Sequence, residues 1–70
     1  MTPEHYRGDG AISCADAMES MVNPAADMLS GMQIYWWLSA AKYVWRWPLK
    51  NGVEDLDKAI DCLQKLKELS

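Results

Sequence analysis

Residues 34–47 read Ile-Tyr-Trp-Trp-Leu-Ser-Ala-Ala-Lys-Tyr-Val-Trp-Arg-Trp, and this stretch decides the fold of the chain. It holds all four tryptophans of the sequence and only two charged residues, Lys42 and Arg46. The stretch suits a helix, although one more apolar than an ordinary surface helix. Pro48 is expected to end that helix, because proline cannot donate a backbone hydrogen bond and disfavours helical geometry in Trp47.

Successive helical residues are about 100° apart, which divides this helix into three stripes. A cationic stripe is formed by Tyr35, Ser39, Lys42 and Arg46. An aromatic stripe beside it is formed by Trp36, Ala40, Tyr43 and Trp47. The remaining arc is wide enough to face a small core, and it contains Ile34, Trp37, Leu38, Ala41, Val44 and Trp45.

The segment before the tryptophan helix predicts a shorter helix. Ser13 and Asp16 have the spacing of a capping box, and apolar residues repeat on one face over about residues 14–22. Asn23-Pro24 stops this helix and can start another, with Asn23 as its N-cap. We expect Gly31 to separate that segment from the tryptophan helix, the alternative being one continuous helix to Trp47.

A further helix is predicted over about residues 53–69, after a turn at residues 50–52. Acidic residues at its start and lysines at its end suit the helix dipole. Its apolar face contains Val53, Leu56, Ala59, Ile60, Cys62, Leu63, Leu66 and Leu69. Asp55 falls within the buried arc, where a lone carboxylate would be costly, so we expect a partner among Lys42, Arg46 and His5.

These elements predict an all-α fold, a compact three-helix domain over residues 13–70 that becomes a four-helix domain if residues 23–30 form their own helix. Residues 1–12 are expected to form an irregular N-terminal arm, since they contain Pro3, Gly8 and Gly10 and show no periodicity. Half of the 70 residues are hydrophobic. A chain this short cannot readily bury that much apolar surface, so we expect a homo-oligomer.

Composition excludes several classes of partner. A net charge of −3 argues against bulk nucleic acid and against anionic membranes. The longest apolar run is far shorter than a membrane span, and the N-terminus does not resemble a signal peptide, so we expect a soluble, cytoplasmic protein. Cys14 and Cys62 are then expected to be buried free thiols, with a disulfide as the alternative in a secreted protein.

Three groups of residues are candidates for a binding site. Lys42 and Arg46 require an anion, which is either a carboxylate among Glu54, Asp55 and Asp57 or a bound phosphate, for which the planar fork of Arg46 is well suited. The aromatic stripe serves either a core or oligomer interface, or the stacking of a base. His5 and Tyr6 either tether the arm or contribute a phosphate ligand or general base.

The sequence lacks the patterns that usually carry catalysis. It has no glycine-rich phosphate loop followed by Lys-Ser/Thr, no paired Cys or His with metal-ligand spacing, and no Ser-His-acid set. We therefore predict no catalytic residue, no metal site and no cofactor.

Four blocks, at residues 3–6, 10–16, 42–47 and 50–59, resemble a family of small phage-encoded proteins of unknown function that are often labelled nucleotide kinase. The label comes from a larger phage T7 enzyme, which phosphorylates deoxynucleoside monophosphates and contains such a segment as part of its chain. The positions that match the family pattern are His5, Tyr6, Lys42, Tyr43, Arg46, Glu54, Asp55 and Lys58. Ile12-Ser13 replaces the usual Ile-Glu of the family and Leu38-Ser39 replaces Gly-Asn, so the resemblance implies nucleotide binding more than phosphoryl transfer.

The leading hypothesis is a phage accessory protein that acts in the host cytoplasm, binds a nucleotide or similar phosphorylated small molecule, and sequesters it as a counter-defence sponge. Phosphate would be held by Lys42, Arg46, His5 and Tyr6, and the base would stack on Trp36, Tyr43 or Trp47. Supporting ion pairs would come from Glu54, Asp55 and Lys58. The alternatives are a protein-binding inhibitor of a host enzyme or defence complex, and a deoxynucleoside monophosphate kinase in which Glu54 or Asp55 holds magnesium.

Overall fold

The computed structural model describes residues 3–70, and its elements are all helical. The structure has three α-helices, α1 (Cys14–Val22), α2 (Gly31–Arg46) and α3 (Val53–Glu68), and a short 3-10 segment precedes each of them. These segments are η1 (Glu4–Tyr6), η2 (Asn23–Met28) and η3 (Trp47–Leu49). The prediction of a compact, all-α, three-helix domain is confirmed.

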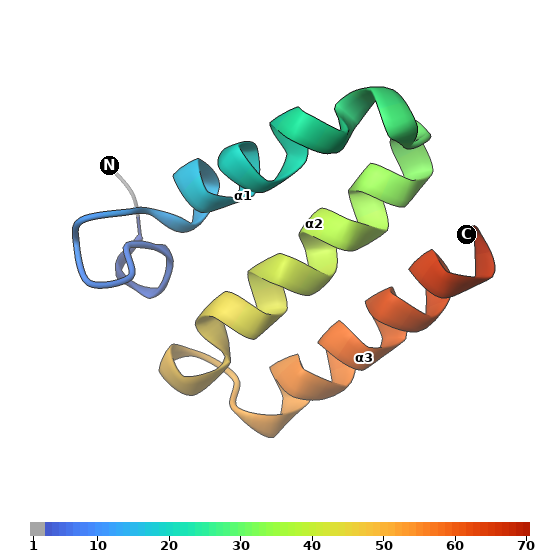
Figure 1. The fold of residues 1–70 in the computed structure, drawn as a ribbon. Helices are drawn as coiled ribbons and strands as arrows, with labels where there is room; N and C mark the ends of the chain where they lie inside the picture. Colours follow the sequence, from blue (N-terminus) through green and yellow to red (C-terminus); the bar gives the residue numbers. More distant parts are fainter. Residues whose placement is uncertain (1–2) are drawn as a thin grey trace.

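The α-helices lie side by side, with α2 between the other two (Figure 1). Most of the tertiary packing joins α2 to α3, and α2 contacts α1 less extensively. No comparable packing joins α1 to α3 among the described residues. The domain therefore buries two narrow sides of α2 and leaves two broad faces open.

The helix starts follow from local capping. Ser13 Oγ accepts a hydrogen bond from Asp16 N at 3.1 Å, which starts α1 as predicted. Ser30 Oγ accepts from Gln33 N at 3.2 Å and Gln33 Oε1 accepts from Ser30 N at 2.8 Å, a complete capping box that starts α2 at Gly31. The predicted break before Gly31 is confirmed, although the sequence reasoning overlooked this box.

Two predicted details of the connections are wrong. Residues 23–28 form a 3-10 helix, so there is no fourth α-helix here, and Asn23 lies inside η2 rather than acting as an N-cap. Trp47 keeps helical dihedral angles, with φ −51° and ψ −41°, although α2 ends just before it as expected. Pro48 therefore tightens the chain into η3, and Gly52, at a φ of +61°, turns it into α3.

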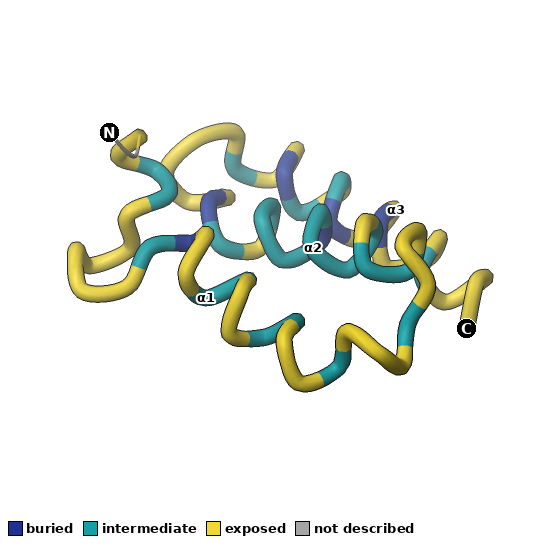
Figure 2. The backbone as a smooth tube through the Cα atoms, turned by 90° about the horizontal axis from the view of Figure 1, so that it is seen from above, coloured by how far each residue is buried: buried dark blue, intermediate teal, exposed yellow. Residues whose placement is uncertain are grey.

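The buried core is formed by small side chains. Its apolar members are Cys14, Ala40, Ala59 and Cys62. Buried positions are few, and most of the tube is half-buried or exposed (Figure 2). Both thiols are free and buried, as predicted. Burial raises the pKa of each thiol above its usual value and outweighs the opposing charge of Lys42.

The predicted apolar faces are only partly buried. On α2, Ala40 of the aromatic stripe is buried whereas Val44 of the predicted core arc is 54% exposed. On α3, four residues expected inside are exposed: Val53, Ile60, Leu63 and Leu69. The prediction was wrong here because it assumed one wide core arc on each helix, while α2 buries a narrow strip toward each of its two neighbours and α3 buries one strip toward α2.

None of the helices formed by residues 3–70 is long and apolar enough to cross a membrane.

The capping box of α2 gives a test of this fold. Replacing Ser30 with Ala removes the side-chain acceptor for Gln33 N, and we expect a loss of about 1 kcal/mol in the free energy of unfolding. Urea denaturation followed by circular dichroism would measure it. Ser20→Ala, at an exposed position inside α1, is the matched control and should change stability by less than about 0.5 kcal/mol; equal losses in both variants would contradict the capping role.

Candidate functional site

A buried ion pair between Arg46 and Asp55 joins the end of α2 to the first turn of α3. Arg46 Nε donates to Asp55 Oδ2 at 3.2 Å, and Arg46 Nη2 donates to Asp55 Oδ1 at 3.2 Å. Asp55 has no exposed surface and Arg46 is only 7% exposed. Such two-point contacts are the strongest and most directional form of this pairing.

Two other segments complete the surroundings of this pair. Arg46 Nη1 donates to the Tyr6 hydroxyl at 2.6 Å, which attaches η1 to α2. From the turn before α3, Asn51 donates to Asp55 through its backbone N, at 3.4 Å to Oδ2, and through Nδ2, at 3.2 Å to Oδ1. Within the described part of the chain, no buried side-chain polar atom lacks a hydrogen-bond partner. We call these four residues, Tyr6, Arg46, Asn51 and Asp55, the polar node.

The node sets the ionisation of both charged groups. Burial alone would raise the pKa of Asp55, but the hydrogen bonds from Arg46 and Asn51 and the charge of Arg46 leave this pKa below its ordinary value. Burial likewise opposes the charge on Arg46, while its bonds to Asp55 and Tyr6 leave its pKa raised overall. Both groups are therefore held in their charged forms.

The node confirms the expected partner for Asp55 and identifies it as Arg46 rather than Lys42 or His5. It also supports the interpretation of the His5-Tyr6 segment as a tether, since Tyr6 binds Arg46 and the His5 ring packs 4.2 Å from the Tyr6 ring. Arg46 presents its guanidinium to Asp55 and Tyr6. A phosphate at Arg46 would have to displace these partners.

Cationic side chains gather around the ring of Tyr43, on one open face of α2 and α3. Lys42 Nζ lies 4.6 Å from the ring centroid, Arg46 Cζ 4.8 Å, and Lys58 Nζ 5.7 Å. Two turns further along α3, Lys65 Nζ lies 5.3 Å from the Trp36 ring. We call this surface the cationic-aromatic face, formed by Trp36, Lys42, Tyr43, Arg46, Lys58 and Lys65.

The charges on this face are only partly compensated. Arg46 is paired with Asp55, and Lys58 Nζ lies 3.6 Å from Glu54 Oε1, so each of these two cations has a carboxylate partner. Lys42, by contrast, forms no salt bridge with any residue in the described range. Lys42, Tyr43 and Arg46 could be placed near one another from the sequence, because they lie on one helix. The positions of Lys58 and Lys65 could not, because they depend on how α3 packs against α2.

The aromatic stripe is divided by the packing. Trp36 and Tyr43 are half-buried beside α3, whereas Trp47, in η3, is 39% exposed. This position supports a packing role for Trp36 and Tyr43. One face of each of these two rings is also the surface over which a lysine lies.

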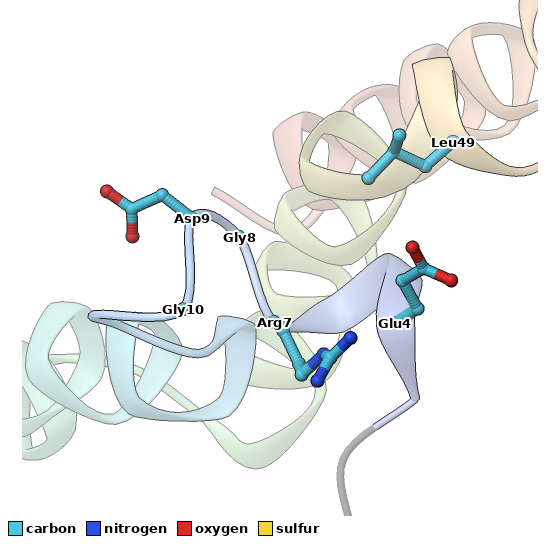
Figure 3. A pocket seen from close by; sticks show the side chains of 6 residues that line it. All are labelled: Glu4, Arg7, Gly8, Asp9, Gly10 and Leu49. Carbon is cyan, nitrogen blue, oxygen red and sulfur yellow. The ribbon is translucent and has the colours of Figure 1, made fainter.

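A pocket of about 430 Å³ lies between the arm and η3, and the sequence reasoning did not anticipate it. Its lining is formed by Glu4, Arg7, Gly8, Asp9, Gly10 and Leu49. The charged side chains point in different directions rather than toward one centre (Figure 3). No group of three potential metal ligands occurs in residues 3–70. The pocket therefore offers no convergent set of donors for a ligand.

The tether from Tyr6 to Arg46 can be tested alone. Tyr6→Phe removes the hydroxyl and leaves a buried Arg46 N–H without its acceptor, so we expect a loss of about 1–3 kcal/mol in the free energy of unfolding. Tyr35→Phe is the control, because Tyr35 is exposed and its hydroxyl makes no hydrogen bond with the described residues. Urea unfolding of both variants would measure the difference, and a silent Tyr6→Phe would show that the arm is not held by this bond.

The lowered pKa of Asp55 predicts how stability depends on pH. An unfolded Asp55 takes up a proton at a higher pH than the folded one, so the contribution of Asp55 is complete above the ordinary pKa of 3.8 and is lost as pH falls toward the folded value. Urea midpoints should decrease on acidification below about pH 4. The carboxyl carbon of Asp55, followed by NMR, should titrate with a midpoint below 3.8, and a midpoint above it would contradict the charged pair.

Comparison with known proteins adds a family to this geometry. No curated protein matches the chain, and no solved structure does. A family described as a protein of unknown function, DUF3310, matches residues 1–64, which include every residue of the polar node. The match agrees with the resemblance to a family of unknown function and adds no support for the nucleotide kinase label. Because the match covers nearly the whole sequence, the chain belongs to the DUF3310 family.

Proposed function

We propose that this protein binds a small phosphorylated ligand of the nucleotide class on the cationic-aromatic face and holds it without converting it. The observation that carries the proposal is the gathering of Lys42, Arg46 and Lys58 around one tyrosine ring. Arg46 and Lys58 each have a carboxylate partner, but Lys42 forms no salt bridge with the described residues, so an anion bound beside the ring would offset its charge.

The charge distribution of the whole chain supports a local anion site. The chain carries a net charge of −3 and has seven Lys and Arg residues, of which four lie on the cationic-aromatic face. An acidic protein repels polyanions at long range, but a small anion responds to the nearest charges because salt screens the rest beyond about 8–10 Å. The face therefore suits a small phosphorylated molecule better than a nucleic acid.

The positions of the residues on the face assign a different role in ligand binding to each of them. Lys42 and Lys58 would contact phosphate oxygens, because at most one carboxylate, that of the exposed Glu54, contacts either ammonium among the described residues. Arg46 would act as a positioning residue, since Asp55 and Tyr6 already hold its guanidinium. The rings of Tyr43 and Trp36 would meet the base once the lysines move onto phosphate.

The ion pairs of the two candidate magnesium ligands, Glu54 and Asp55, favour sequestration over phosphoryl transfer. Glu54 is paired with Lys58 and Asp55 with Arg46, so each would have to leave a cation in order to hold magnesium. A kinase must also place two phosphate groups and a metal together, which needs more donors than this face provides. In a phage, such a protein would remove a nucleotide signal from the host cytoplasm and so oppose a host defence.

The protein-binding alternative is favoured by a different observation, namely the exposed apolar side chains on the other face of α2 and α3. An inhibitor of a host protein could use them as anchors. Binding of a partner there would leave the cationic-aromatic face free.

Calorimetric titration with mono-, di- and cyclic nucleotides, and with pyrophosphate, would test the proposal. We expect at least one nucleotide to bind, and the double variant Lys42→Ala/Lys58→Ala to weaken binding at least about tenfold, since a hydrogen bond to a charged group contributes about 1.5–3 kcal/mol. The matched control is Lys50→Ala/Lys67→Ala, which removes the same charge from two exposed positions outside the face. Circular dichroism would verify that both variants keep their helices.

The outcomes separate the candidate functions. Absence of binding by every nucleotide and by pyrophosphate would overturn the proposal, and equal weakening by the control pair would reduce it to non-specific attraction. Incubation with ATP, magnesium and a deoxynucleoside monophosphate, followed by denaturation and analysis of the released nucleotides, distinguishes sequestration from transfer. Unchanged nucleotides are expected, and formation of a diphosphate would favour the kinase.

A further inference from the structure

An uncovered apolar surface lies opposite the cationic-aromatic face. On α3, Ala59 and Cys62 face α2, and Lys58 and Lys65 project to the side where the rings of α2 lie. Since successive residues are about 100° apart, Ile60 and Leu63 project to the other side of α3. We call this surface the apolar face, formed by Trp37, Val44, Val53, Leu56, Ile60 and Leu63.

Four of the six residues of the apolar face are exposed, and Trp37 and Leu56 are half-buried. The exposed fractions are 54% for Val44, 68% for Val53, 59% for Ile60 and 48% for Leu63. A row of four large aliphatic side chains along two neighbouring helices is a continuous patch rather than a scatter of single residues. Patches of this kind on small proteins mark interaction surfaces.

We propose that the apolar face is the contact surface for a second copy of this chain, in a dimer with twofold symmetry. Folded domains normally place two layers of secondary structure around one core, and here the three helices lie side by side without a covering layer (Figure 1). Two copies joined at this face supply the missing layer to one another. The larger aliphatic side chains then form a core that the single chain does not have.

The surface area of the chain supports a second copy as the partner at the apolar face. A compact monomer of 8.0 kDa is expected to expose about 4,450 Å², whereas this chain exposes 4967 Å². The layer of three helices extends over 31 × 26 Å, an outline of about 800 Å² that includes α1 and is close to the area that each partner buries in a stable interface. A dimer centred on the apolar face would therefore also bury exposed parts of the layer around it.

Charge also favours a second copy. Copies of a chain with a net charge of −3 repel one another over most of their surface. The six members of the apolar face are uncharged, and Lys67, one turn after Leu63 on the same side of α3, adds a cation at the end of the face, so the contact carries little of the acidic charge that makes the copies repel. In a twofold dimer each residue of the face is used twice, and self-complementarity requires only that the face be apolar and nearly flat.

This inference is independent of the proposed ligand site. Joining two apolar faces leaves each cationic-aromatic face on the outside of the dimer, where a ligand can reach it. Failure of nucleotide binding would therefore say nothing about the dimer, and a monomeric protein could still bind a nucleotide.

Sedimentation equilibrium over a wide concentration range would test the dimer. We expect the wild-type protein to reach twice the 8.0 kDa mass of the chain. Ile60→Glu should weaken the dimer by a factor on the order of a hundred or more, because each dimer would then bury two carboxylates in apolar surroundings. The matched control is Met32→Glu, which introduces the same charge at a 54% exposed residue one turn before Trp36, away from the apolar face, and should leave the dimer intact.

A second measurement covers the case in which Ile60→Glu fails to fold. The melting temperature of the wild-type protein should rise with protein concentration, because unfolding of a dimer also separates its chains. A wild-type monomer at every concentration, or a melting temperature independent of concentration, would overturn the proposal. Equal dissociation of the Ile60→Glu and Met32→Glu variants would place the dimer contact elsewhere and overturn it as well.

Discussion

The two-point contact between Arg46 and Asp55 is the interaction on which the arrangement of helices depends. Arg46 is the last residue of α2 and Asp55 lies in the first turn of α3, so one contact fixes where the two helices meet. Tyr6 and Asn51 bind the same pair and thereby attach the arm and the turn to it. A buried ion pair adds little net stability over apolar residues of the same size, but the loss of one partner leaves an uncompensated charge. The node therefore specifies the geometry more than it supplies stability.

The side chains behind this node explain why so much apolar surface is left outside. Ala40, Ala59 and Cys62 let α2 and α3 approach closely, and small side chains bury little area on each helix. The larger aliphatic residues of α3 then fall to the side of the contact rather than within it. The large residues are thus exposed because the two helices pack through small ones.

The sequence predicted most of the fold through local signals. Ser13, Pro48 and Gly52 act on their own backbone or on near neighbours, and the helix ends that they predicted lie within about one residue of the observed ones. The partner of Asp55 could also be predicted, because a buried carboxylate needs a cation and few were within reach. The packed side of α2 could not, since Ala40 gives a weaker hydrophobic signal than the tryptophans around it. The bond from Tyr6 to Arg46 spans forty residues and leaves no local pattern.

The polar node also contributes to the cationic-aromatic face. It lies at one end of the α2-α3 contact, and its Arg46 reaches the ring of Tyr43 on the cationic-aromatic face. Asp55 holds Arg46 beside Tyr43 through a buried two-point contact, whereas Lys58 has only the exposed Glu54 as its partner and Lys42 has no salt bridge with the described residues. The face thus combines one positive charge that is buried and held at two points with two that are more exposed. All three lie around the Tyr43 ring, on the side of α2 and α3 opposite the exposed aliphatic residues.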